Sequence, residues 1–182
     1  MKRTLVPAIC LLTHSLIPLQ AASLEVDKQR SHIQVDASAT AHSFTGTLKT
    51  FEAKVSGDAS SLKPTGFDLS WKFGDLDSAE PKRDAEMIKW LGDGNPKGSF
   101  KFIKSWTDNA GRDNGMGTLT IHGVSKTIAF PYTVKQESGL VTIDGKVEMD
   151  YQNFNLPIVR AMAIMTVDPK LEVSFHIVGK IR

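Results

Sequence analysis

The residues that could carry out acid–base or metal chemistry are few in this sequence of 182 residues. Beyond the first 21 residues the histidines are His32, His42, His122 and His176, and none pair at a metal-ligand spacing on a predicted helix. The single cysteine, Cys10, lies within those first residues. The sequence contains no nucleophile elbow, phosphate-binding loop or dinucleotide fingerprint. We therefore predict no catalytic residue, no metal site and no cofactor, although a triad assembled from distant positions stays open.

Three charged side chains stand where they could meet a polar group of a bound molecule. Arg160 shares its strand phase with Met162 and Ile164, so it is a candidate to point inward, where a guanidinium suits phosphate or carboxylate. The alternative is an ion pair with a nearby acid, which we favour slightly because an unpaired inward charge is costly. Arg83 and Asp84 begin a predicted helix and either flank a cavity mouth or pair with each other.

The first residues have the pattern of a secretory signal peptide. Lys2 and Arg3 precede a mostly apolar run at residues 5–19, and small residues follow, with cleavage expected after Ala21 or Ala22. The run is too short and too interrupted for a membrane span, which needs roughly 20 apolar residues, so an uncleaved anchor is the weaker interpretation. We predict a signal peptide at residues 1–21, one domain at residues 22–182 and a periplasmic or secreted protein without a stable membrane span.

Removal of the signal peptide changes the charge balance. Loss of Lys2 and Arg3 reduces 22 basic residues to 20, against 20 acidic ones. A near-neutral surface is not drawn to nucleic acid or to anionic lipid headgroups. The remaining domain also has no cysteine, so core burial must stabilise it.

Alternation of apolar and polar residues dominates the sequence from residue 24 onward. In one segment four apolar side chains alternate with three polar ones, namely Phe67, Leu69, Trp71 and Phe73 with Asp68, Ser70 and Lys72. Such alternation places one apolar and one polar face on a strand. The pattern recurs over residues 33–40, 51–56, 99–106, 118–121, 127–134, 141–150 and 171–177.

These segments predict about eight or nine half-buried antiparallel strands, which form a sandwich or a barrel. Trp106 keeps the phase of Phe102 and is expected on the same face. Asp144 and Gly145 could form a hairpin turn, but the alternation continues through them, so we interpret them as mid-strand.

Two segments break the alternation. Residues of about 80–91 have helical character, with Asp77 or Ser78 as the expected cap and Gly92 or Gly94 as the end, and this helix is expected to cover one end of the barrel. Residues 158–167 are apolar in both phases, so their outer face is either covered, which we favour, or an interaction surface.

Several short stretches, taken together in their order and spacing, are distinctive. They are Val26-Asp27, Ser31-His32-Ile33, residues 41–46 (AHSFTG), Arg83-Asp84, residues 117–126 (GTLTIHGVSK), and Phe154 with Arg160. In these stretches the chain resembles the YceI-like family of secreted lipid- and polyisoprenoid-binding proteins. The resemblance implies an all-β fold, an eight-stranded antiparallel extended lipocalin-like barrel with one short inserted helix, which holds a long isoprenoid or similar amphiphile. Members commonly carry a histidine where this chain has Glu86, and residues 92–96 form a shorter segment here, so the ligand's identity does not transfer.

An eight-stranded barrel is either filled by its own side chains or just wide enough for one small ligand. Small residues in the inward phase, such as Ala37, Ala39, Ala53 and Gly145, leave volume, and the resemblance favours a cavity over tight packing. Met87 and Trp90 of the helix could equally be core residues. The predicted ligand-binding residues are Ala37, Ala39, Trp71, Phe73, Met87, Trp90, Phe102, Phe130, Arg160, Met162 and Ile164.

The sequence thus predicts non-covalent binding of a polyisoprenoid, an isoprenoid quinone or another lipid by an exported carrier or sequestering protein. The expected partner is an apolar small molecule or lipid, not nucleic acid, and a homodimer stays open. The first alternative is an exported interaction module with a filled barrel. The second is an enzyme that acts on a lipid.

Overall fold

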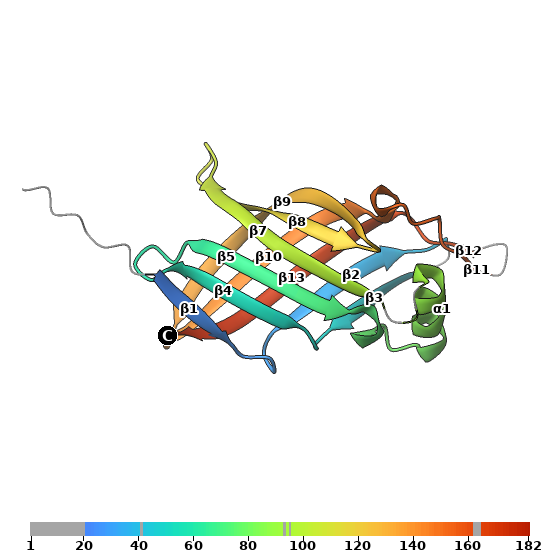
Figure 1. Cartoon of the computed structure of the whole chain (residues 1–182), viewed down its shortest axis with the longest axis horizontal. Helices are drawn as coiled ribbons and strands as arrows, with labels where there is room; N and C mark the ends of the chain where they lie inside the picture. The colour runs from blue at the N-terminus through green and yellow to red at the C-terminus, as the bar shows by residue number, and fades with distance from the viewer. Residues whose placement is uncertain (1–20, 41, 93, 95, 162–164) are drawn as a thin grey trace, which may run out of the picture.

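The alternating segments fold into a single antiparallel barrel, elongated along its axis, with one α-helix across an end (Figure 1). The computed structural model describes residues 21–40, 42–92, 94, 96–161 and 165–182. Its strands are β1 (Ala21–Val26), β2 (His32–Ser38), β3 (Ser43–Leu48), β4 (Glu52–Asp58), β5 (Pro64–Lys72), β6 (Leu76–Asp77), β7 (Lys97–Thr107), β8 (Asp113–Ile121), β9 (Val124–Glu137), β10 (Leu140–Asp150), β11 (Arg160–Ala161), β12 (Met165–Thr166) and β13 (Lys170–Ile181). The helices are the 3₁₀ turns η1 (Phe73–Asp75) and η2 (Tyr151–Phe154) and the α-helix α1 (Pro81–Leu91).

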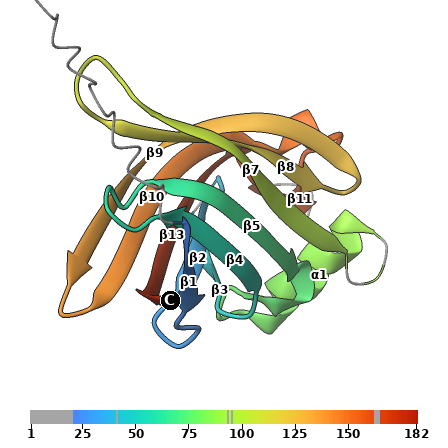
Figure 2. The same ribbon diagram turned by 60° about the vertical axis from the view of Figure 1, so that its left-hand side comes forward.

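Eight strands close a ring in the order β1-β4-β5-β7-β8-β9-β10-β13, and β13 pairs back with β1. Because β13 also pairs with β2, the sheet continues from it through β2 and β3 (Figure 2), and β3 pairs in turn with β6. The predicted eight-stranded antiparallel barrel is confirmed, with these extra strands outside the ring.

The break between β1 and β2 is sealed by a buried serine. Both strands pair with the same edge of β13, and the Ser31 hydroxyl lies between them opposite Val178. It donates to the Val178 carbonyl at 3.3 Å and accepts from the Val178 N–H at 2.9 Å. The serine thus gives the Val178 N–H the partner that a continuous strand would have supplied, while the Val178 carbonyl also accepts the Asp27 N–H at 2.8 Å.

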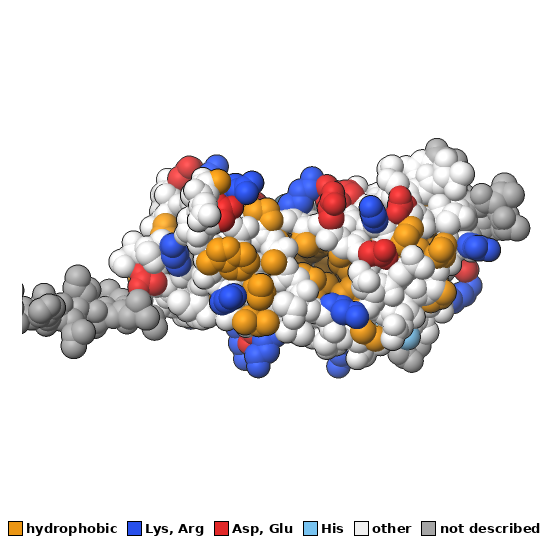
Figure 3. Space-filling model, turned by 90° about the horizontal axis from the view of Figure 1, so that it is seen from above, with side chains coloured by type: hydrophobic (Ala, Val, Ile, Leu, Met, Phe, Trp, Pro, Cys, Tyr) orange, Lys and Arg blue, Asp and Glu red, His pale blue; other side chains and the backbone are white. Residues whose placement is uncertain are grey.

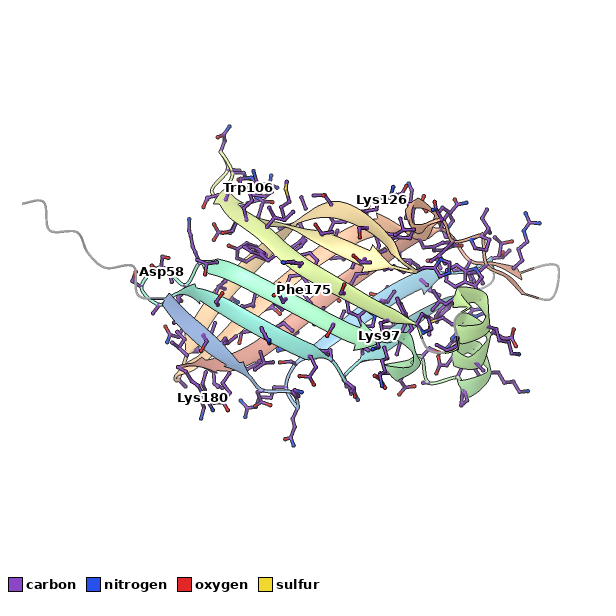
Figure 4. The ribbon with its side chains drawn as sticks, viewed as in Figure 1. Asp58, Lys97, Trp106, Lys126, Phe175 and Lys180 are labelled. Carbon is purple, nitrogen blue, oxygen red and sulfur yellow. The ribbon has the colours of Figure 1, made fainter. Side chains whose placement is uncertain are left out.

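The strands follow the sequence pattern except at one bulge. β10 runs without interruption through Asp144 and Gly145, as predicted. In β7, however, Phe102 pairs with Gly117 and the next registered pair is Lys104 with Met116, which leaves Ile103 as an extra residue. A bulge of one residue reverses the facing of everything beyond it. The prediction that Trp106 shares the face of Phe102 is therefore wrong, and Trp106 lies on the outside with 37% of its surface exposed (Figure 4).

The helix forms where it was predicted but begins differently. Glu80, not Asp77 or Ser78, is its N-cap, and the Glu80 carboxylate accepts the Lys82 N–H. Pro81 suits the first helical position because its missing N–H has no partner there, and Gly92, with φ of 70°, ends the helix as expected. The helix lies across one end of the barrel, as predicted (Figure 1).

Two predictions fall largely outside the described residues. The proposed signal peptide covers residues 1–21, of which only Ala21 is described, at the start of β1. Of the apolar segment 158–167, residues 162–164 are not described, while its flanks form the short pair β11–β12. The signal peptide and the covering of that segment both stay predictions.

Candidate functional site

The helix-covered half of the barrel contains an apolar cavity of about 190 Å³. It is enclosed by inward side chains of the strands, by η1 and by one face of α1. The described side chains that line it are all aliphatic, aromatic or methionine: Ile33, Val35, Leu48, Phe67, Leu69, Trp71, Phe73, Leu76, Met87, Trp90, Leu91, Phe100, Leu119, Ile121, Ile128, Phe130, Val147, Met149, Tyr151, Leu156, Leu171, Val173 and Phe175. Such a lining favours hydrocarbon and offers almost nothing to a charged ligand.

Four phenylalanines from four strands form the floor of this cavity. The ring centroids of Phe67, Phe100, Phe130 and Phe175 form a closed circuit with successive separations of 5.9, 5.7, 5.4 and 6.2 Å. These are favourable aromatic contact distances. Below this Phe floor the described residues line small voids of about 20 and 40 Å³, far less than the volume above it. Figure 4 labels Phe175 in the interior of the barrel.

Glycines on the inner surface give the aromatic rings their positions. A Cβ atom added at Gly145 would lie less than 3.0 Å from three carbons of the Phe175 ring. Gly98 stands in the same relation to Trp71, and a Cβ atom at Gly117 would lie less than 3.0 Å from two carbons of the Phe100 ring and from the Lys101 carbonyl oxygen. Each ring therefore lies flat against the backbone of a neighbouring strand, which leaves the barrel centre open on the helix side.

The helix closes the opposite end through aromatic and polar contacts. The Trp90 Nε1–H donates to the Pro157 carbonyl at 3.0 Å. The Trp90 ring packs edge-on against the Tyr151 ring, with 5.2 Å between the two ring centroids. The Tyr151 hydroxyl donates to the Val167 carbonyl at 3.0 Å and accepts the Val159 N–H at 3.2 Å. Burial raises the pKa of Tyr151 above its ordinary value. This hydroxyl is committed to the backbone, so it is not a free acid or base.

The turn before the helix is held by Ser78. The Arg83 guanidinium donates to both the carbonyl and the hydroxyl of Ser78 and lies 4.3 Å from the centre of the Phe44 ring. The Ser78 hydroxyl in turn donates to Asp84. Arg83 and Asp84 thus fasten the start of the helix through a shared serine, and neither lines the cavity.

A larger hollow of about 890 Å³ lies on the outer surface, but its chemistry differs. It is open to solvent, and its lining mixes apolar residues with polar ones. The polar residues include His176, whose Nδ1 is 2.6 Å from Asp144, and His32, whose ring centroid is 5.2 Å from that of His176. Within the described ranges, no set of three or more His, Cys, Asp or Glu side chains is arranged to hold a metal ion. Nor does any helix among the described residues have the length and apolar character needed to cross a membrane. The smaller, apolar cavity inside the barrel is therefore the better candidate for binding.

The family model of the YceI-like domain matches residues 24–179, nearly the whole described barrel. The chain belongs to the YceI-like family. The resemblance carried by residues 41–46 and 117–126 is thereby confirmed. The comparison with curated proteins gives no match.

Solved structures share the fold of this YceI-like protein. The crystal structure of Burkholderia cenocepacia BcnA has a TM-score of 0.71 at 20% identity, over 86% of this chain and all of that one. A polyisoprenoid binding domain from Saccharophagus degradans, implicated in plant cell wall breakdown, has a TM-score of 0.66 at 13% identity, over 91% of this chain and all of that one. The Campylobacter jejuni YceI protein has a TM-score of 0.53 at 19% identity, over 61% and 70%. At these identities the likeness establishes the fold alone.

The structure brings some of the predicted ligand-binding residues of this YceI-like protein together and separates others. Trp71, Phe73, Met87, Trp90 and Phe130 line the cavity. Phe102 lines the smaller void below the Phe floor. Ala37 is buried and Ala39 half-buried, but neither lines the cavity, and Arg160 is exposed in β11. Met162 and Ile164 lie outside the described residues. Whether any of these residues binds a ligand stays a prediction.

The sequence analysis did not single out most of the cavity wall. Phe67, Phe100 and Phe175 complete the floor, and Leu119 and Val173 belong to the wall. All five were in the inward phase of their strands, so alternation alone could have nominated them. Alternation does not say at which level along the barrel axis a residue lies, because that level depends on strand tilt and register.

Proposed function

We propose that this YceI-like protein binds a long apolar molecule non-covalently inside its barrel, as an exported carrier or sequestering protein. The observation that carries the proposal is the cavity between the Phe floor and α1, whose described lining is almost wholly apolar. The polyisoprenoid binding domain with the same fold makes a polyisoprenoid or an isoprenoid quinone the first ligand to test. The predicted signal peptide at residues 1–21 supports export to the periplasm or beyond.

The cavity supports binding rather than catalysis. Among the described residues that line it, only Tyr151 carries a hydroxyl, and that hydroxyl is bonded to two backbone groups. A reaction that needs a general acid or base would have no suitable group there. Burial of hydrocarbon requires none.

The energetics favour a long ligand. Each buried methylene contributes about 0.8 kcal/mol, and micromolar affinity corresponds to about 8 kcal/mol. A ligand without polar contacts therefore needs roughly ten buried methylenes, and more once the cost of association is included. A headgroup contributes little in a lining of this kind, so binding strength is expected to rise with chain length.

Native mass spectrometry of the exported protein with its lipid extract tests the proposal. Bound prenyl or acyl species are expected on the wild-type protein. Val173→Trp adds bulk inside the cavity, whereas Ser174→Trp adds the same bulk to the outer surface one residue along β13. Loss of lipid is expected in the first variant only, with thermal unfolding to verify that both fold. A folded Val173→Trp protein that keeps its lipid, or a wild-type protein that takes up no prenyl or acyl chain, would contradict the proposal.

A further inference from the structure

The geometry points to a window in the barrel wall between β9 and β10, through which a single hydrocarbon chain reaches the cavity sideways. This inference rests on the proposed function and specifies its route of access. The cavity is about 190 Å³ in volume, whereas pockets for drug-sized ligands measure about 300–1,000 Å³. A chain of the length argued above must therefore leave part of itself outside the cavity.

Both ends of the cavity are obstructed. The Phe floor blocks one end with four rings in mutual contact. At the other end α1 is held by the hydrogen bond of Trp90 to Pro157 and by the contacts of Arg83 with Ser78 and Phe44. A chain that passed either end would have to break these contacts.

The side wall contains a gap where strand pairing stops. Residues 124–150 are all described, and within them β9 and β10 pair only from Glu137 with Leu140 to Tyr132 with Gly145. Beyond that point β9 pairs with β8 alone and β10 with β13 alone. Pro131, the first residue past the last pair, has no N–H to donate, so a ladder through it would lack a donor.

The gap opens onto the cavity. Ile128 and Phe130 on β9 and Val147 and Met149 on β10 flank it, and all four line the cavity. Its far end is bounded by η2, which contacts β9. Figure 3 looks down on the face that carries β9 and shows hydrophobic side chains in a hollow, with charged side chains around it. We define this gap, between the Tyr132–Gly145 pair and η2, as the side window.

The chemistry of the side window fits a hydrocarbon tail. Its inner rim is apolar, while the outward residues of the same strand segments include Ala129 on β9 and Lys146 and Glu148 on β10, all exposed. A chain lying in the window keeps apolar contact along its length and leaves any headgroup at the charged outer rim. A pair of facing strands closed by a hydrogen-bonded ladder could not provide this path.

Two matched alanines allow the route to be tested. Ala129 is exposed on the rim of the side window, and Ala85 is exposed on α1 at the barrel end. Each is changed to cysteine in a Cys10→Ser background, where the introduced thiol is the only one in the chain. Each thiol is then coupled to a bulky polyethylene-glycol maleimide, and thermal unfolding verifies the fold.

Uptake and release of a long-chain fatty acid labelled at its carboxyl end are followed by stopped-flow fluorescence. With the label at Ala129→Cys, association and dissociation rates should both fall by about tenfold or more, with Kd unchanged, because the obstruction lies on the path and not in the cavity. The label at Ala85→Cys should change neither rate. Slowing by the Ala85→Cys label alone, or by neither, overturns the side window. Absence of binding to the unlabelled protein instead overturns the proposed function, and the inference falls with it.

Discussion

Gly145→Ala is expected to destabilise this protein only while the Phe175 ring is present. The new methyl group would lie less than 3.0 Å from three ring carbons, so the ring or the strand must move. Overpacking of this kind costs about 1–3 kcal/mol. Because φ of Gly145 is not positive, alanine fits the backbone there. Alanine also reduces the conformational entropy of the unfolded chain, which stabilises the folded protein by about 0.4–1 kcal/mol. The net expectation is a loss of about 0.5–2 kcal/mol.

In a Phe175→Leu background the sign should reverse. Leucine keeps an apolar side chain on the floor but removes the flat ring that lies against Gly145, so the overpacking cost disappears. Gly145→Ala should then stabilise by about 0.4–1 kcal/mol, which gives a coupling free energy of about 1–3 kcal/mol between the two positions.

Equilibrium urea unfolding of the wild type, both single variants and the double variant measures this coupling. The reasoning is refuted if Gly145→Ala has the same effect in both backgrounds, with a coupling below about 0.5 kcal/mol. That outcome would mean that the ring is not held against the strand. The cavity would then owe its volume to something other than the glycine positions.

Three further outcomes are expected. Trp90→Phe removes the hydrogen bond to Pro157 but keeps an aromatic ring. Thermal unfolding should therefore show a loss of about 0.5–1.5 kcal/mol in the free energy of unfolding, and amide exchange in α1 should be faster. Unchanged stability would show that this bond does not hold the helix. Hydrogen bonds from two nearby serines lower the pKa of Asp58 from its ordinary value of 3.8 to about 2. The contribution of this carboxylate to the stability of the folded protein is therefore complete above pH 3.8 and is lost as the pH falls through about 2. An NMR titration of Asp58 with a midpoint near 3.8 would contradict this. Ile103→Lys changes a bulge residue that is 53% exposed, so urea unfolding should differ by less than about 0.5 kcal/mol, and a larger loss would place this side chain in a contact.

The fold was largely predictable because its signal is local. Alternation of apolar and polar side chains is a property of neighbouring residues, and it correctly indicated antiparallel strands, including the passage of β10 through Gly145. The helix at Pro81–Leu91 was equally predictable from the proline at its start, the glycine after its end and the helical spacing of its apolar residues. The predicted cap was wrong, since the side chains of Asp77 and Ser78 form hydrogen bonds in the turn before the helix and Glu80 is the N-cap.

The site was less predictable because it depends on contacts between distant residues. Trp106 illustrates the difficulty: one extra residue at Ile103 reverses its facing, and nothing in the local pattern shows that residue to be unpaired. Ala37 and Ala39 were nominated as small inward residues, yet the volume arises elsewhere, where Gly117 and Gly145 let rings lie flat against the backbone.

The sequence by itself determined which face of each strand is apolar, where the chain turns and where the helix lies, since these follow from side-chain period and from glycine and proline positions. Only the tertiary structure decided at which level along the barrel axis each inward side chain lies. The closure of the ring fixes strand tilt and register, and these gather four phenylalanines, distributed from residue 67 to residue 175, into one layer. The divergence of β9 from β10 likewise belongs to the assembled barrel, because it results from how each strand pairs with its other neighbour.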